Sequence, residues 1–329
     1  MESSSQTAFC HGLLKQADLA LEQGKAQHSA VLAGQVQVQA IGMRDLHLRA
    51  QAELIIARVD TLCSRFVDAR RRSLFAVDQF QRREDPDRLP LALDVRNYST
   101  SCLGNTQQAL TWAQESFSLR EADDDPQVTF TGLTYIGVMH AFDGQYLQAD
   151  EMLASAGWFA RETRTPGVHL HALLNQGLAL MMSLVAGGPP VTSNPDLERL
   201  EQLLSQAHRV NSNGTSVQIP LQAGNACMTQ VVLQFLTAGV LALSKQSDRA
   251  TLHLVNCNMW LRALPRTSWL HTLPWWGQAL WAWQKGDLAR AVLCAGEMEM
   301  AARVGQNVPM QRLASGFRQQ LRQQAAGAL

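Results

Sequence analysis

Apolar residues recur along most of this chain at intervals of three and four positions, which is the spacing of one face of an α-helix. The alternating pattern of a half-buried strand is nearly absent. The pattern predicts seven consecutive helices over residues 46–63, 65–83, 87–103, 105–121, 126–143, 145–163 and 167–186. Further helices are expected near 195–210 and over 307–326. The chain is therefore predicted to be all-α.

Residues of three kinds recur every 40 positions, and such a fixed period is typical of a helical repeat array. Small or short residues fall in mid-helix at Ala17, Ala57, Asn97, Gly137 and Gly177, and later at Gly239 and Ala279. Turn residues fall at Gly24, Ser64, Gly104 and Gly144, and later at Gln246 and Gly286. Side chains suited to helix N-caps fall at Asp45, Asp85, Asp125 and Thr165, and later at Thr267 and Asn307.

The period is interrupted once. The interval from Gly177 to Gly239 is 62 residues, which is 22 longer than the period. Turn-rich sequence on both sides of residues 195–210 accounts for the difference. We therefore expect one continuous array with N-terminal repeats over 1–186, an insertion in the fifth repeat over 187–226, and C-terminal repeats over 227–329 that end in a polar capping helix.

The clearest repeat carries a mid-helix glycine, a turn glycine, an aromatic residue two positions on, and then small and large apolar residues on the second helix. These residues are Gly137, Gly144, Tyr146, Ala149, Leu153 and Ala156. The combination resembles the tetratricopeptide repeat (TPR), whose usual period is 34 residues. The longer period is similar to that of regulatory arrays in bacterial signalling proteins, including sensor regions of LuxR-type activators and arrays that precede diguanylate cyclase domains.

The resemblance implies a right-handed α-solenoid of about seven antiparallel helix pairs and a capping helix. It also implies a non-enzymatic module for interaction or sensing. Some members of the family hold a chain terminus with repeated Lys and Asn residues. Here only Lys15, Arg58 and Asn175 lie on suitable faces, so that activity is not expected.

Composition narrows the choice of partner. Lys plus Arg equals Asp plus Glu at 28 each, so no overall field favours nucleic acid or an anionic membrane. The N-terminus lacks the layout of a signal peptide. The two most apolar stretches, 170–186 and 228–243, are interrupted by polar residues and are expected to be core helices. Six cysteines with irregular spacing suggest free thiols, and we expect a cytoplasmic protein.

No catalytic, nucleotide-binding or metal-binding motif is recognisable, and no enzyme activity, cofactor or metal is expected. His169 and His171 are two positions apart, so on a helix they point to different sides. The acidic run 123–125 is interpreted as a helix cap at Asp125. The basic run 70–72 is interpreted as a solvated face, although contact with an acidic partner is an alternative.

Tryptophan is concentrated near the C-terminal end. Six of the eight lie between Trp260 and Trp283, and Trp269, Trp276 and Trp283 recur every seven residues. We expect one helix to carry this stripe and Pro274 to kink it. The rings fit either core packing or a binding patch.

Two functions remain open. The first is a scaffold that binds a protein or peptide in a concave groove lined by the first helix of each pair. The candidate groove residues are Arg58, Tyr98, Thr134, Tyr135, His171, Asn175, Trp276 and Trp283. The second is a sensor that binds a small effector near the fifth repeat, with the insertion as a lid, and acts on a separate output domain. An enzyme built on the scaffold has no motif to support it.

Overall fold

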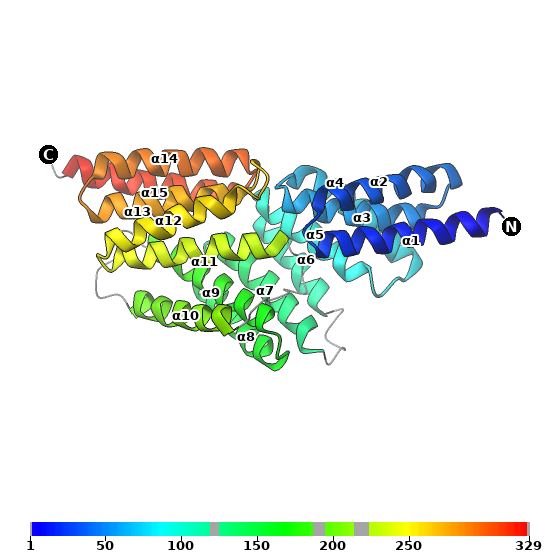
Figure 1. The fold of residues 1–329 in the computed structure, drawn as a ribbon, viewed down its shortest axis with the longest axis horizontal. Helices are drawn as coiled ribbons and strands as arrows, with labels where there is room; N and C mark the ends of the chain where they lie inside the picture. Colours follow the sequence, from blue (N-terminus) through cyan, green and yellow to red (C-terminus); the bar gives the residue numbers. More distant parts are fainter. Residues whose placement is uncertain (1, 119–124, 187–194, 214–223, 328–329) are drawn as a thin grey trace.

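The computed structural model describes residues 2–118, 125–186, 195–213 and 224–327. In these ranges the chain forms fifteen α-helices and one short 3-10 helix, and no strand (Figure 1). The elements are α1 (Glu2–Glu22), α2 (Ala26–Met43), α3 (Leu46–Leu62), α4 (Phe66–Arg83), α5 (Leu89–Cys102), α6 (Thr106–Ser118), α7 (Pro126–Phe142), α8 (Tyr146–Glu162), α9 (Pro166–Ala186), α10 (Pro195–Asn213), α11 (Gly224–Leu243), α12 (Ser247–Leu261), η1 (Trp269–His271), α13 (Thr272–Gln284), α14 (Leu288–Val304) and α15 (Val308–Gly327).

Seven helix pairs and a closing helix, α15, make up a solenoid, which confirms the predicted fold class. The helix expected near 195–210 is α10, and it packs on α9 as the second helix of the fifth pair. The turn-rich segments on either side of α10 lie outside the described residues. The division of the array at the fifth repeat therefore stays a prediction.

Helix ends follow the predicted cap and turn residues. The carboxylate of Asp45 accepts from the amides two and three positions on, at 3.0 and 2.9 Å. Asp125 and Asn307 cap α7 and the start of α15 in the same way. Four turn glycines adopt the left-handed backbone that glycine tolerates best. They are Gly24, Gly104, Gly144 and Gly286.

Two predicted caps are wrong. Residues 86–88 form a turn before α5, so Asp85 accepts from the amide of Arg88 at 3.1 Å and α5 begins only at Leu89. Ser268, and not Thr267, caps η1, because the hydroxyl of Thr267 donates to the carbonyl of Cys63. The prediction that one helix carries Trp269, Trp276 and Trp283 is also wrong, because Trp269 belongs to η1. Pro274 is not in mid-helix as expected but lies in the first turn of α13, where backbone N–H groups need no acceptor within the helix, so the reason for expecting a kink is removed.

Close approach between paired helices explains the mid-helix glycine in the clearest repeat. A Cβ added to Gly137 on α7 would lie 2.6 Å from Leu153 Cγ on α8, well inside van der Waals contact. The α7–α8 pair is among the most closely packed in the array. The small residue at this position therefore sets the distance between the two helices.

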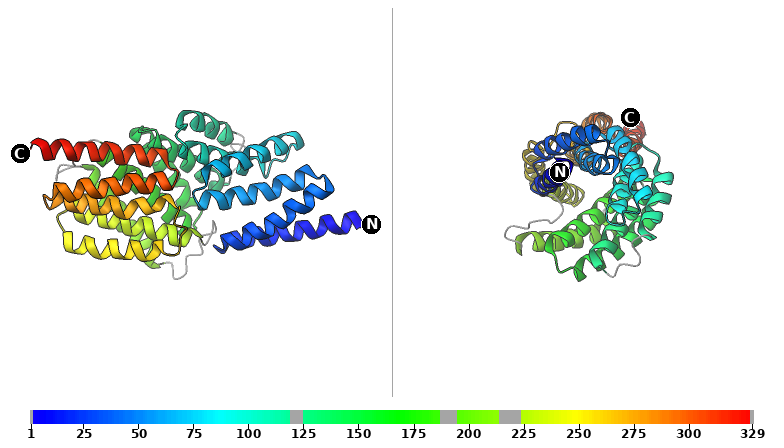
Figure 2. Two further views of the ribbon diagram at one scale, coloured as in Figure 1. Left: turned by 90° about the horizontal axis from the view of Figure 1, so that it is seen from above. Right: turned by 90° about the vertical axis from the view of Figure 1, so that its right-hand side faces the viewer.

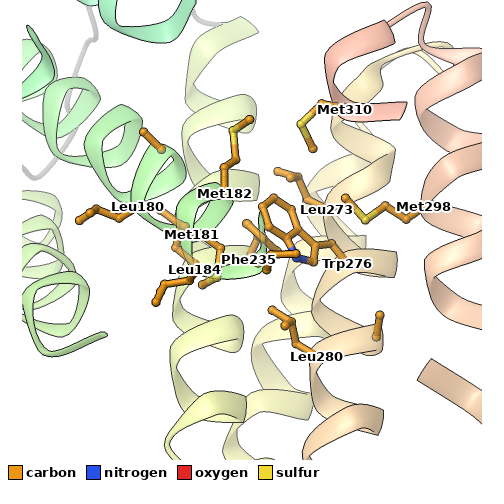
Figure 3. Close-up of a cluster of buried hydrophobic side chains, with 14 of the residues drawn as sticks. Leu180, Met181, Met182, Leu184, Phe235, Leu273, Trp276, Leu280, Met298 and Met310 are labelled. Carbon is orange, nitrogen blue, oxygen red and sulfur yellow. The ribbon is translucent and has the colours of Figure 1, made fainter. Parts of the chain in front are cut away.

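The largest core cluster extends from Phe66 to Leu321 and includes the place where α9, α11 and α13 meet. Trp276 is fully buried there, with its ring centroid 4.9 Å from that of Phe235. Figure 3 shows both rings among Leu273, Leu280 and the methionines of α9. Helix α9 is long and apolar enough to cross a membrane, but 72% of its most apolar window is buried inside the protein. It is therefore the central core helix that its pattern predicts.

The solenoid curls, as seen end-on in Figure 2, so that the turn of its second helix pair meets the loop that precedes α13. Thr267 Oγ1 donates to the carbonyl of Cys63 at 2.6 Å, and the amide of Trp269 donates to Ser64 Oγ at 3.0 Å. Nearby, the α5–α6 turn packs against the first turn of α15. The turn at residues 63–66 and the loop at 265–271 are thus held together across about 200 positions of sequence. We call this contact the closure.

Candidate functional site

A central cavity of about 330 Å³ lies inside the curled solenoid. It is lined by α3, α5, α7, α9 and α11, which are the first helices of five consecutive pairs, starting with the second. Among the described residues of the second helices, only Leu153 on α8 lines the cavity. The closure completes the wall through Ser64 and residues 268–270. The cavity therefore occupies the position at which the sequence predicts a concave groove.

Six of the eight candidate groove residues line this cavity. They are Arg58, Tyr98, Thr134, Tyr135, His171 and Asn175. They come from four different helices, so their proximity results from the stacking of the pairs. Whether these residues contact a partner stays a proposal.

The two tryptophans lie elsewhere. Trp276 is fully buried in the core cluster and cannot line a groove, which corrects that expectation. Its ring packs between α11 and α13 against Phe235. This is core packing, one of the two roles that the sequence left open for the tryptophans. Trp283 is half-buried, and its Nε1 donates to Gln324 on α15 at 3.0 Å. The seven-residue spacing placed both rings on the side of α13 that packs against its neighbours.

An aromatic wall forms one side of the cavity. Tyr98 lies at its centre, with ring centroids 5.9 Å from Phe66, 6.3 Å from Tyr135 and 6.4 Å from Phe142. The Tyr98–Phe66 and Tyr98–Tyr135 pairs meet edge to face, a favourable geometry for aromatic rings. Burial raises the pKa of Tyr98 well above its usual value, so the phenol stays neutral and serves as a hydrogen-bonding group.

Two formal charges reach the cavity among the described residues, and both have partners. Arg58 Nη1 lies 2.7 Å from Asp18 Oδ1, so its charge is offset by a carboxylate on α1. Asp94 is buried and accepts a hydrogen bond from Ser116 Oγ at 3.3 Å. Both groups therefore already interact with other parts of the protein.

A second polar region lies on α7 and α9. Thr134 is buried, and its Oγ1 has neither a hydrogen-bond partner nor solvent contact. His171 faces the cavity edge-on to Phe130, and burial lowers its pKa to about 4, so the imidazole is neutral at pH 7. Asn175 Nδ2 donates to the carbonyl of His171 at 3.0 Å, which fixes the amide along the helix.

The sequence missed the residues that the closure supplies. Ser64 and the stretch 268–270 reach the cavity only because distant turns meet, and nothing in their local pattern indicates this. The apolar part of the wall, with Val138, Leu178 and Val232, also went unnamed. Val138 and Leu178 were recognisable, because they lie one turn beyond Thr134 and Asn175 on the same faces of α7 and α9, whereas α11 had no predicted lining residue.

The other candidate sites are explained locally. His169 lines a small separate cavity beside the α8–α9 turn, so it and His171 point to different sides as predicted. No group of three potential metal ligands occurs among the described residues. In the basic run, Arg72 bridges Glu53 and Asp60 on α3, and Arg71 pairs with Asp68 on its own helix. Positions 123 and 124 of the acidic run lie outside the described residues.

Comparison with known proteins supports the fold alone. No family model and no curated protein matches the chain. A Rap protein solved in complex with Competence and Sporulation Factor is similar over 97% of this chain and 98% of its own, with a TM-score of 0.58 and 11% identity. The apo form of RapI is similar over 97% and 99%, with a TM-score of 0.51 and 9% identity.

A tetratricopeptide repeat protein from Parabacteroides merdae ATCC 43184 is similar over 93% of this chain and 98% of its own, with 11% identity and a TM-score of 0.45. The chain has a TPR-like helical repeat fold.

Proposed function

We propose that this chain is a non-catalytic TPR-like scaffold that captures a peptide, or an exposed segment of a protein, in its central cavity. The observation that carries the proposal is the cavity itself, which gathers five first helices and six of the predicted groove residues. Apolar walls with a few placed polar groups are typical of ligand sites. The similar Rap protein was solved with Competence and Sporulation Factor bound, which is consistent with ligand capture on this fold.

The chemistry of the lining favours binding over catalysis. His171 titrates near pH 4 because of burial, so it is a weak base at neutral pH. Burial also raises the pKa of the Cys102 thiol, beside Tyr98, which disfavours the reactive thiolate. In this proposal the lining side chains recognise the ligand and leave it unchanged. A role in bacterial signalling follows from the sequence resemblance and is part of the proposal.

A small effector is the second candidate. A volume of about 330 Å³ lies at the lower end of the range for small-ligand pockets. Under this reading the effector binds in the cavity and the chain acts on a separate output protein. Of the insertion expected to act as a lid, α10 packs on α9, and residues 187–194 and 214–223 lie outside the described residues. A metabolite panel tests the candidate, because a ligand that binds only the folded state raises the melting temperature.

The proposal is tested by selecting a random peptide library on the immobilised chain and on two matched variants. Leu178→Trp places an indole in the cavity, whereas Leu147→Trp makes the same change at an exposed position of α8. We expect peptides recovered on the wild type to bind Leu147→Trp equally and Leu178→Trp at least about tenfold more weakly. Equal binding to all three proteins, or no enrichment on the wild type, contradicts the proposal.

A further inference from the structure

The hydroxyl of Thr134 is an unsatisfied polar group in the cavity wall. The residue is only 7% exposed, and its Oγ1 has no hydrogen-bond partner. Threonine in a helix usually returns its hydroxyl to the carbonyl one turn back, as Thr131 does to Gln127 at 2.8 Å. Thr134 leaves that bond unmade. A change of χ1 rotamer moves Oγ1 to another staggered position, which lets the hydroxyl turn towards a group held in the cavity that Thr134 lines.

Two other described lining residues carry a formal charge, and each has a partner within the protein. Arg58 is paired with Asp18, and Asp94 is buried with partners of its own. His171 is uncharged at pH 7 because it is shielded from bulk solvent. Moving a charged group from water into such a cavity is strongly unfavourable unless a free opposite charge meets it. No such charge is present among the described lining residues.

We infer that the group held in the cavity is uncharged and largely apolar, and that it offers a hydrogen-bond acceptor to Thr134. The apolar wall around Val138, Leu178 and Val232 holds its hydrocarbon part. An amide carbonyl beside an aliphatic or aromatic group has this chemistry. Two sources supply it: an apolar residue of a bound peptide, or a free neutral amphiphile. The inference rests on the proposed function, since it describes the ligand of the same cavity.

The inference is tested with three probes that share one alkyl chain and differ in charge: octanamide, octanoate and octylamine at pH 7. Dissociation constants are measured by saturation-transfer NMR titration of the full chain. We expect octanamide to bind at least about tenfold more tightly than either charged probe. Octanoate or octylamine binding as tightly as octanamide overturns the inference, as does the absence of octanamide binding.

Matched threonine variants test the hydrogen bond. Thr134→Val should weaken octanamide about fivefold, because the acceptor is left unpaired in the cavity. Thr134→Ser keeps the hydroxyl and should bind like the wild type. Thr131→Val removes a hydroxyl from the same wall that is already bonded within α7, so it should change binding less than about twofold. Equal effects of Thr131→Val and Thr134→Val contradict the assignment. Melting curves establish that each variant is folded.

A peptide arm separates the two sources. Peptides recovered on the wild type should contain an aliphatic or aromatic residue whose replacement by Glu or Lys weakens binding at least about tenfold. Neutral probe binding without any peptide capture leaves the inference standing and refutes the peptide function. Peptide capture that depends on a charged anchor residue refutes the inference and leaves the peptide function intact.

Discussion

The main-chain amide of Trp269 donates a hydrogen bond to the side-chain oxygen of Ser64 at 3.0 Å. Both residues are buried, and 205 positions separate them. Together with the bond from Thr267 to Cys63, this contact holds the second helix pair against the seventh. Because Ser64 and residues 268–270 also line the cavity, the closure links the shape of the whole solenoid to the site.

Weakening the closure should loosen this region before the rest of the fold. Thr267→Val keeps the side-chain shape but removes the donor to the Cys63 carbonyl. We expect a loss of about 1 kcal/mol in the free energy of unfolding, a usual value for one hydrogen bond. Hydrogen exchange followed by mass spectrometry should speed up in peptides that span 61–66 and 267–271. Unchanged exchange there would show that the closure does not depend on this bond.

The two tryptophans of α13 should differ in their effect on stability. Trp276→Ala empties a fully buried site beside Phe235, so we expect a loss of about 3–5 kcal/mol. Trp283 is half-buried and contributes one hydrogen bond to Gln324, so Trp283→Ala should cost about 1–2 kcal/mol. Urea denaturation measures both values. Equal losses would contradict the assignment of Trp276 to the core.

Acid should destabilise the fold partly through His171. Burial lowers its pKa to about 4 in the folded chain, against an ordinary value of 6.5. Below pH 6.5 the unfolded state therefore binds more protons, so this contribution to stability is complete above pH 6.5 and is lost as the pH falls towards 4. His171→Gln should reduce the loss between pH 6.5 and 4.5 by on the order of 2 kcal/mol. Parallel stability curves for the two proteins would refute this prediction.

The fold was largely predictable from the sequence, because helix periodicity, caps and turn glycines are local signals. Asp45, Gly104 and Gly137 each have a role that neighbouring residues determine. The expectation that the first helix of each pair lines the groove also located Tyr98, Thr134 and His171 on the cavity wall. The closure was not predictable, since it depends on how small rotations accumulate over five helix pairs. The buried position of Trp276 was not predictable either, because tryptophans that pack in the core and tryptophans that bind a ligand recur at the same spacing along a helix.

The proposed function places the ligand in the cavity between the first helices. Photo-cross-linking tests this placement. A peptide recovered from the library carries a benzophenone at its apolar anchor residue, and mass spectrometry identifies the segment of this chain to which the peptide becomes attached. We expect attachment within α7 and α9, residues 126–142 and 166–186. The attachment should be lost in Leu178→Trp but not in Leu147→Trp. Attachment on an outer helix such as α12 or α14, unaffected by Leu178→Trp, would contradict this placement.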